Sequence, residues 1–237
     1  MALAQAGMCP KPNAGPENAL SKEEKASGYS LLFDGRSTDQ WRGAYLDSFP
    51  AKAWVVLNGT LSHLKSAGAE STSGGDIITK EEYADFTLSL EWKIEKGGNS
   101  GIKYYVVENF PKPEGSALGL EFQILDDENH PDALKGKDGN RKAGSVYDLI
   151  PAPANKKLNK VGEWNHTVVV TKGNHAEHWL NGMLTASYER DSDSFKALVA
   201  GSKYKDKPGF GSWPKGHILL QDHGDLVQYR SIKIRKS

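Results

Sequence analysis

The stretch GLEFQILDDENH, residues 119–130, alternates as a β-strand does and then becomes a polar loop. Its even-numbered apolar positions share one face, which suits a hydrophobic core. Glu121 and Gln123 lie on the other face, just before Asp126, Asp127 and His130. Taken alone, the pattern is also typical of a half-exposed strand that ends in a polar turn, and that is its simpler interpretation.

Short strands follow one another on both sides of this stretch. Residues 86–94 give the longest alternation, and Asn58-Gly59 and Asn181-Gly182 are typical of tight hairpin turns. Helical periodicity is almost absent outside the N-terminal segment and residues 193–198. The sequence therefore predicts an all-β fold of two packed antiparallel sheets, a sandwich or jelly roll, as a single domain over residues 29–237. The expected strands are 31–33, 54–57, 60–64, 86–94, 102–107, 119–125, a short one near 146–147, 164–171, 175–180, 183–188, 217–221 and 227–234.

The amino-acid composition narrows the range of ligands and sites that this protein can have. Thirty basic residues balance thirty acidic ones, so nothing in the net charge favours nucleic acid or an anionic membrane, and a neutral or weakly charged ligand is expected. The only cysteine, Cys9, excludes an intramolecular disulfide and a multi-cysteine metal site. No apolar run has the length of a membrane span.

Residues 1–28 are rich in Ala, Pro, Lys, Glu and Asn and suggest a leader and tether. The segment Ala4-Gln5-Ala6 fits the small-x-small pattern at which export signals are cleaved. A flexible leader of no special function explains it almost as well. The export interpretation places the protein in the periplasm or outside the cell.

One face of the expected sandwich carries polar and aromatic side chains that suit a sugar. Aromatic rings stack on the apolar faces of sugar rings, while carboxylates, amides and histidines bond their hydroxyls. Alternation puts Lys103 and Tyr105 on this face, opposite Ile102 and Tyr104. Alternation also puts Glu121, Gln123, Gln221, His223 and either Trp179 or His178 on this face. Trp213 lies in a glycine-rich loop that could close over a ligand.

Six motifs in collinear order, between residues 30 and 235, resemble the 3-keto-disaccharide hydrolase family. They are Leu32-Phe33-Asp34-Gly35 with Trp41, Gly98-Asn99-Ser100-Gly101-Ile102, Glu121-x-Gln123-Ile124-Leu125-Asp126, Gly162-Glu163-Trp164-Asn165, Leu180-Asn181-Gly182, and GHILLQDHG at 216–224 with Val227 and Arg230. Ser231 departs from the asparagine usual in the family's last strand. The resemblance implies a concanavalin A-like sandwich and an exported bacterial enzyme that acts on glycosides oxidised at C3.

The implied chemistry is removal of the C2 proton beside the C3 ketone, β-elimination of the C1 substituent, and addition of water. Such a site needs a base and a partner for the enolate oxygen. We expect Glu121, His223 or His130 as the base, and Lys103 or a divalent cation as that partner. Asp126 and Asp127 are candidate ligands of such a cation. Expected substrate contacts are Gln123, Gln221, Tyr105, Tyr147, Trp179, Trp213 and Asn99.

Two other functions remain open at this point. The same fold supports a carbohydrate-binding module without catalysis. An ordinary glycosidase needs two carboxylates across the scissile bond, but the position two residues after Glu121 is the amide Gln123, so Asp126 or Asp127 would have to supply the second acid.

Overall fold

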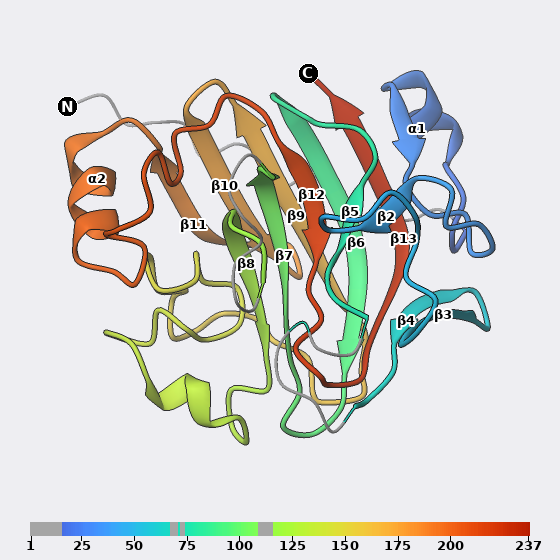
Figure 1. Cartoon of the computed structure of the whole chain (residues 1–237), viewed down its shortest axis with the longest axis horizontal. Coiled ribbons are helices and arrows are strands. Elements are labelled where there is room, and N and C mark those ends of the chain that lie inside the picture. The colour runs from blue at the N-terminus through green and yellow to red at the C-terminus, as the bar shows by residue number, and fades with distance from the viewer. Residues whose placement is uncertain (1–15, 67–70, 72–73, 109–115) are drawn as a thin grey trace.

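The computed structural model describes residues 16–66, 71, 74–108 and 116–237 and confirms a sandwich of two antiparallel sheets (Figure 1). The larger sheet has the order β11 (Met183–Glu189), β10 (His175–Leu180), β9 (Asn165–Lys172), β6 (Phe86–Ile94), β13 (Val227–Lys236), β4 (Thr60–His63) and β3 (Trp54–Leu57), with β1 (Tyr29–Leu31) also paired to β13. The five-stranded sheet has the order β2 (Trp41–Gly43), β5 (Ile77–Thr79), β12 (His217–Leu220), β7 (Asn99–Val106) and β8 (Leu120–Leu125). The helices are α1 (Lys22–Ala26), α2 (Asp193–Ala200) and the 3-10 turn η1 (Pro131–Leu134).

The main core lies between the two sheets, as the alternation predicts. In β6 every second residue from Phe86 to Ile94 is buried, and in β8 Leu120, Phe122 and Ile124 join the same cluster. Period-two alternation places these side chains on one face of each strand. Glu121 and Gln123 therefore lie on the outward face of the five-stranded sheet.

Both predicted hairpin turns are present. Asn58 and Gly59 connect β3 to β4 with φ angles of 49° and 74°, and Asn181 and Gly182 connect β10 to β11 with 47° and 80°. Two successive positive φ angles favour Asn-Gly and match the twist of the flanking strands.

The predicted position of Tyr105 on the ligand face is wrong. Tyr105 has a φ of 54°, and the pairing of β12 with β7 shifts at this point, so the alternation of β7 is interrupted. Tyr104 and Tyr105 consequently both enter the core between the sheets, and Val106 instead turns to the other face beside Leu219. The Tyr105 hydroxyl donates to the carbonyl of Ala84 at 2.8 Å.

The predicted position of Trp179 is also wrong, because β10 belongs to the larger sheet. The neighbouring His178 points into the core, where its Nε2 lies 2.7 Å from the Tyr104 hydroxyl. Trp179 donates through Nε1 to Glu177 of its own strand at 2.9 Å. Trp179 is therefore on a different sheet from Glu121.

The short helix α1, where the sequence shows Lys22-Glu23-Glu24-Lys25, is attached to the larger sheet. Glu24 accepts two 2.9 Å hydrogen bonds from Nζ of Lys233, whose side chain is fully buried. The predicted cleavage pattern near Ala4 lies outside the described residues.

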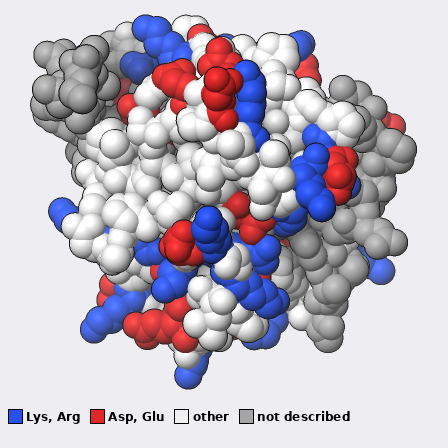
Figure 2. Space-filling model, turned by 90° about the vertical axis from the view of Figure 1, so that its left-hand side faces the viewer, with Lys and Arg blue, Asp and Glu red and all other residues white. Residues whose placement is uncertain are grey.

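Acidic and basic side chains are interspersed on the face seen in Figure 2, which fits a chain with no net charge. Among the described residues, no helix is both long enough and apolar enough to cross a bilayer.

Candidate active site on the five-stranded sheet

A buried ion pair between Glu121 and Lys103 lies on the outward face of this sheet. The two residues are direct partners across β8 and β7, and Lys103 Nζ lies 3.6 Å from Glu121 Oε2. Nζ also donates to Ser116 Oγ at 2.5 Å and to the Ala117 carbonyl at 3.1 Å. Two hydrogen bonds thus hold the ammonium group of Lys103 beside the Glu121 carboxylate.

Asp76 extends this polar cluster, although no sequence motif points to it. Its carboxylate is almost fully buried and accepts from Ser116 Oγ at 2.6 Å and from the backbone N–H groups of Ala117 and Asp222, both at 3.0 Å. Burial raises the pKa of Asp76, although Lys103 acts in the opposite direction. Asp76 therefore connects Lys103 to the segment that follows β12.

A row of side chains leads from Glu121 to His223. The amide of Gln123 lies 3.0 Å from Glu121 Oε1 at one end and 3.3 Å from the amide of Asn99 at the other. The Asn99 amide in turn lies 3.1 Å from His223 Nε2. Gln221 borders this row, since its backbone N–H donates to the Gly101 carbonyl at 3.0 Å.

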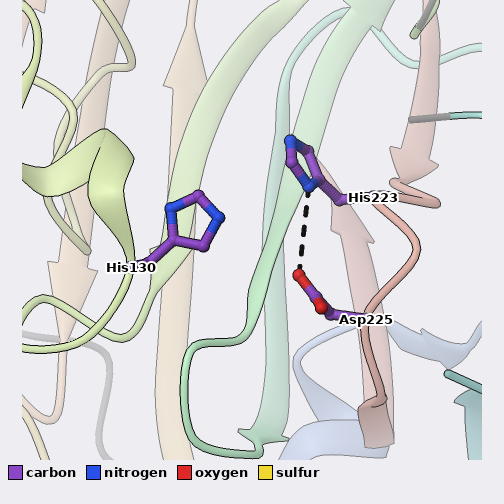
Figure 3. Close-up of side chains that lie close together, drawn as sticks. All are labelled: His130, His223 and Asp225. Atoms are coloured by element: carbon purple, nitrogen blue, oxygen red, sulfur yellow. Dashed lines mark ion pairs between the residues drawn. The ribbon is translucent and has the colours of Figure 1, made fainter. Parts of the chain in front are cut away.

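His130 and His223 meet at the more open end of the row, with Asp225 beside them (Figure 3). The two rings are 5.8 Å apart and nearly perpendicular, and His223 Nδ1 lies 3.9 Å from Asp225 Oδ2. Ligand atoms of the three residues all lie within 4.8 Å of one another, so among the described residues this group could share a cation. Burial lowers the pKa of His130, and the nearby His223 lowers it further.

His130 is held by the loop that carries it. Its Nδ1 accepts a hydrogen bond from the backbone N–H of Asp132 at 3.1 Å, at the start of η1. Asp132 also accepts from Arg141 at 3.2 Å and from the Tyr147 hydroxyl at 2.8 Å. Arg141 reaches Asp148 as well, at 2.7 Å, so one guanidinium connects both parts of the loop.

Tyr147 lies next to Glu121, as expected for a residue of the site. Its backbone N–H donates to the Glu121 carbonyl at 3.0 Å. Burial raises the pKa of Tyr147, and the negative charges of Glu121 and Asp132 raise it further. Tyr147 is therefore a hydrogen-bond donor that stays protonated.

Asp126 and Asp127 do not form the predicted cation site, because protein donors already engage them. Asp126 accepts from the Gly97 N–H at 2.7 Å and from Asn129 Nδ2 at 2.8 Å; burial raises its pKa, but these and further donors outweigh burial and lower it. Asp127 pairs with Lys156 at 2.6 Å. These carboxylates organise the loop after β8.

Trp213 packs against the core between the two sheets. Its ring meets Phe210 edge to face, and its carbonyl accepts from Arg190 at 2.8 Å. Arg190 stacks on Tyr105 at 4.0 Å.

The structure therefore gathers most of the predicted residues and separates a few. It brings together Glu121, Lys103, Gln123, Asn99, Gln221, His223, His130 and Tyr147. It adds Asp76, Asp132, Arg141 and Asp225, which sequence reasoning missed. Of these, only Asp225 had a local signal, as an acid two residues after His223.

Comparisons with known proteins agree with this architecture. Residues 28–235 match the family model described as a 3-keto-alpha-glucoside-1,2-lyase-like domain. A "3-keto-disaccharide hydrolase" of Bacteroides thetaiotaomicron is 35% identical over 244 residues, covering 92% of this chain and 81% of the relative.

Two solved structures are also similar to this chain. A "putative glycosyl hydrolase" of Parabacteroides distasonis is 32% identical with a TM-score of 0.81, covering 94% of this chain and 100% of that one. The endo-beta-1,3(4)-glucanase SCLam is 12% identical with a TM-score of 0.50, covering 89% of this chain and 92% of that one, and shows similarity of fold alone.

Proposed function

The chain belongs to the family of 3-keto-alpha-glucoside-1,2-lyase-like domains and is a carbohydrate-processing enzyme, and on this premise we propose that it cleaves glycosides whose sugar carries a ketone at C3. The family and the sugar-acting relatives support the substrate class. The acid–base cluster on the five-stranded sheet supports the reaction type.

The proposed reaction begins with removal of the C2 proton by a base. The electron pair of the C–H bond forms an enolate with the C3 ketone, and its collapse breaks the bond from C1 to the leaving oxygen, which takes up a proton. Water then adds across the new double bond, which returns a 3-keto sugar and completes a net hydrolysis. The reaction needs no oxidant or reductant.

The juxtaposition of His130 and His223 is the observation that carries this proposal. Two histidines 5.8 Å apart can divide the work, one accepting the proton and the other donating a hydrogen bond to developing negative charge. We assign proton removal to His223 and enolate stabilisation to His130. Glu121, held by Lys103, accepts hydrogen bonds from sugar hydroxyls.

A divalent cation is the alternative partner of the enolate. His223 and Asp225 would hold it, and it would act as a Lewis acid on the ketone oxygen. The Nδ1 of His130, in contrast, is engaged by the Asp132 N–H. A neutral imidazole that accepts a hydrogen bond through Nδ1 carries its proton on Nε2 and has no second lone pair for a cation. His130 is therefore less suited to be the third ligand.

An ordinary two-carboxylate mechanism finds less support. Glu121 is paired with Lys103, and Asp126 and Asp127 are engaged by other protein donors. The pKa of Asp126 is lowered and all three carboxylates are held by protein donors, whereas such a mechanism requires a free general acid with a raised pKa.

The test is to incubate the purified protein with a 3-keto-glucoside and with the unoxidised glucoside, each with EDTA or with added divalent metal. Enone absorbance and released aglycone would be followed. Turnover of the keto substrate alone supports the proposal. Loss of that turnover in EDTA and its recovery with added metal would show that a cation stabilises the enolate. Turnover of the unoxidised glucoside would contradict it, and tight binding without turnover of either would identify a binding module.

We also propose that the enzyme acts in the periplasm or outside the cell, from the cleavage pattern Ala4-Gln5-Ala6. Cell fractionation of the source bacterium, with an antibody to this chain, tests this; recovery with cytoplasmic markers would contradict it.

A further inference from the structure

The hydrogen-bond partners of Gln123 decide which end of its amide carries nitrogen. One end lies 3.0 Å from the Ser100 carbonyl and 3.0 Å from Glu121 Oε1. A backbone carbonyl can only accept, and so can a carboxylate paired with Lys103. That end of Gln123 is therefore the NH2 group, and the other end is the carbonyl oxygen.

The orientation of the Gln123 amide also determines that of Asn99, which contacts His223. Before Gln123 is turned, its Nε2 faces Asn99 Oδ1 at 3.3 Å; after the turn two oxygens would meet there, so Asn99 must turn as well and present its NH2 group to Gln123. In its unturned orientation Asn99 places Nδ2 at 3.1 Å from His223 Nε2, so turning this amide places Oδ1 there instead. An oxygen there requires a proton on Nε2, and neutral His223 is left with its lone pair on Nδ1.

His130 has the complementary arrangement. Its Nδ1 accepts from the Asp132 N–H at 3.1 Å, so neutral His130 carries its proton on Nε2. Figure 3 shows one ring nitrogen of His130 directed toward His223 and Asp225. One histidine of the pair thus offers a lone pair and the other offers an N–H.

We infer that Gln123 and Asn99 are positioning residues that hold His223 in the tautomer with the proton on Nε2, so that Nδ1 is the proton-accepting atom and Nε2–H of His130 is the donor to the enolate oxygen. The His223 tautomer rests on turning the Gln123 and Asn99 amides together, whereas the roles rest on the proposed function. Glu121 accepts a hydrogen bond from Gln123 and so orients its amide. Gln123 in turn orients Asn99, which determines the basic nitrogen of His223.

Nitrogen-15 spectra of the full chain test the tautomers directly. Long-range proton–nitrogen correlations would be recorded at about pH 8 or above, where histidine is ordinarily neutral, after treatment with chelator. We expect a protonated Nε2 in both His130 and His223. A protonated Nδ1 in His223 would overturn the inference, whether or not the enzyme turns over keto-glucosides.

Two substitutions of Asn99 distinguish a role in positioning His223 from a role in folding. Asn99→Asp keeps an oxygen facing His223, so the tautomer should be unchanged; if Asn99 instead donated its NH2 to Nε2, the tautomer would switch. Asn99→Leu removes the oxygen and should lower kcat about tenfold or more, with a smaller change in KM. Gln228→Leu is the matched control, because this amide of β13 contacts Thr60 at 3.4 Å, and its kcat should remain that of the wild type.

Misfolding of a variant, absence of a positioning role and failure of the proposed function give different results. If Asn99→Leu does not fold, the wild-type and Asn99→Asp spectra still decide the tautomer. If Asn99→Leu folds and retains full kcat, the positioning role is wrong. Failure to turn over keto-glucosides, with the expected tautomers observed, would remove the proposed function and leave the hydrogen-bond assignment intact.

Discussion

A Cβ atom added to Gly101 would lie 2.3 Å from Oε1 of Glu121 and 2.8 Å from its carboxyl carbon. These separations are far below van der Waals contact, so the Glu121 carboxylate occupies the space that a side chain at position 101 would fill. The glycine is required by this close approach, and its φ is not in the left-handed region.

Gly101→Ala should therefore displace Glu121 and lower kcat/KM about a hundredfold, because small misplacements in an active site have effects of this size. The expected loss of stability is about 1–3 kcal/mol, typical of overpacking. Steady-state kinetics and denaturant unfolding measure the two effects.

Gly201→Ala is the control for Gly101→Ala, because a Cβ at position 201 would come no closer than 3.5 Å to another atom. This variant should keep both activity and stability. Full activity in Gly101→Ala would show that the position of Glu121 does not matter.

The loop that carries His223 and Asp225 is anchored by a buried contact between His63 and the Asp222 carboxylate. His63 Nε2 lies 2.9 Å from Asp222 Oδ1, with both side chains fully buried, and His63 Nδ1 lies 3.0 Å from the Asp225 carbonyl. Removing one partner leaves the other buried without compensation, so Asp222→Asn should destabilise the protein by about 3–5 kcal/mol.

This anchor should depend on pH. Burial raises the pKa of Asp222, but hydrogen bonds from His63, Gly224 and Gly75 outweigh burial and hold it below the usual value. The stabilisation is therefore fully present above about pH 4, the unfolded-state pKa, and is lost as pH falls through the lower folded-state value. Unfolding free energies of wild type and Asp222→Asn should converge in that acidic window; a constant difference down to pH 2 would contradict the assignment.

Tyr105 should matter for stability and not for chemistry. Tyr105→Phe removes a hydrogen bond to the Ala84 carbonyl and should cost about 1 kcal/mol of unfolding free energy, with kcat and KM unchanged. A large fall in kcat would instead indicate that Tyr105 takes part in substrate binding or catalysis.

The two histidines should contribute to different steps. His223→Gln should abolish exchange of the C2 proton of a 3-keto-glucoside with deuterated water and lower kcat by about 10²–10⁴. His130→Gln should lower kcat while keeping slow exchange, because the base remains. Exchange at the wild-type rate in His223→Gln would assign proton removal to another residue, with Glu121 as the next candidate.

His175→Gln is the matched control for the histidine variants. His175 lies in β10 of the larger sheet, paired with Glu177 and Glu189, so its substitution should leave both proton exchange and kcat unchanged.

The sequence by itself determined the parts of this protein that depend on local periodicity. Alternation identified the core faces of β6 and β8, and Asn-Gly pairs identified two hairpins, because a side chain's direction and a turn's φ angles depend on its own segment. It also placed Glu121, Gln123 and Lys103 on one face, since no irregularity precedes them in their strands. The resemblance of six motifs supplied the family.

Only the tertiary structure decided what depends on neighbouring strands. The irregularity at Tyr105 arises where β7 pairs with β12, and no pattern within β7 reveals it. His130 and His223 come from loops far apart in the sequence, and they meet because β8 and β12 both flank β7. Which nitrogen of His223 carries the proton depends on the turned amides of Gln123 in β8 and Asn99 in β7, so it is a property of the assembled sheet and of no single segment.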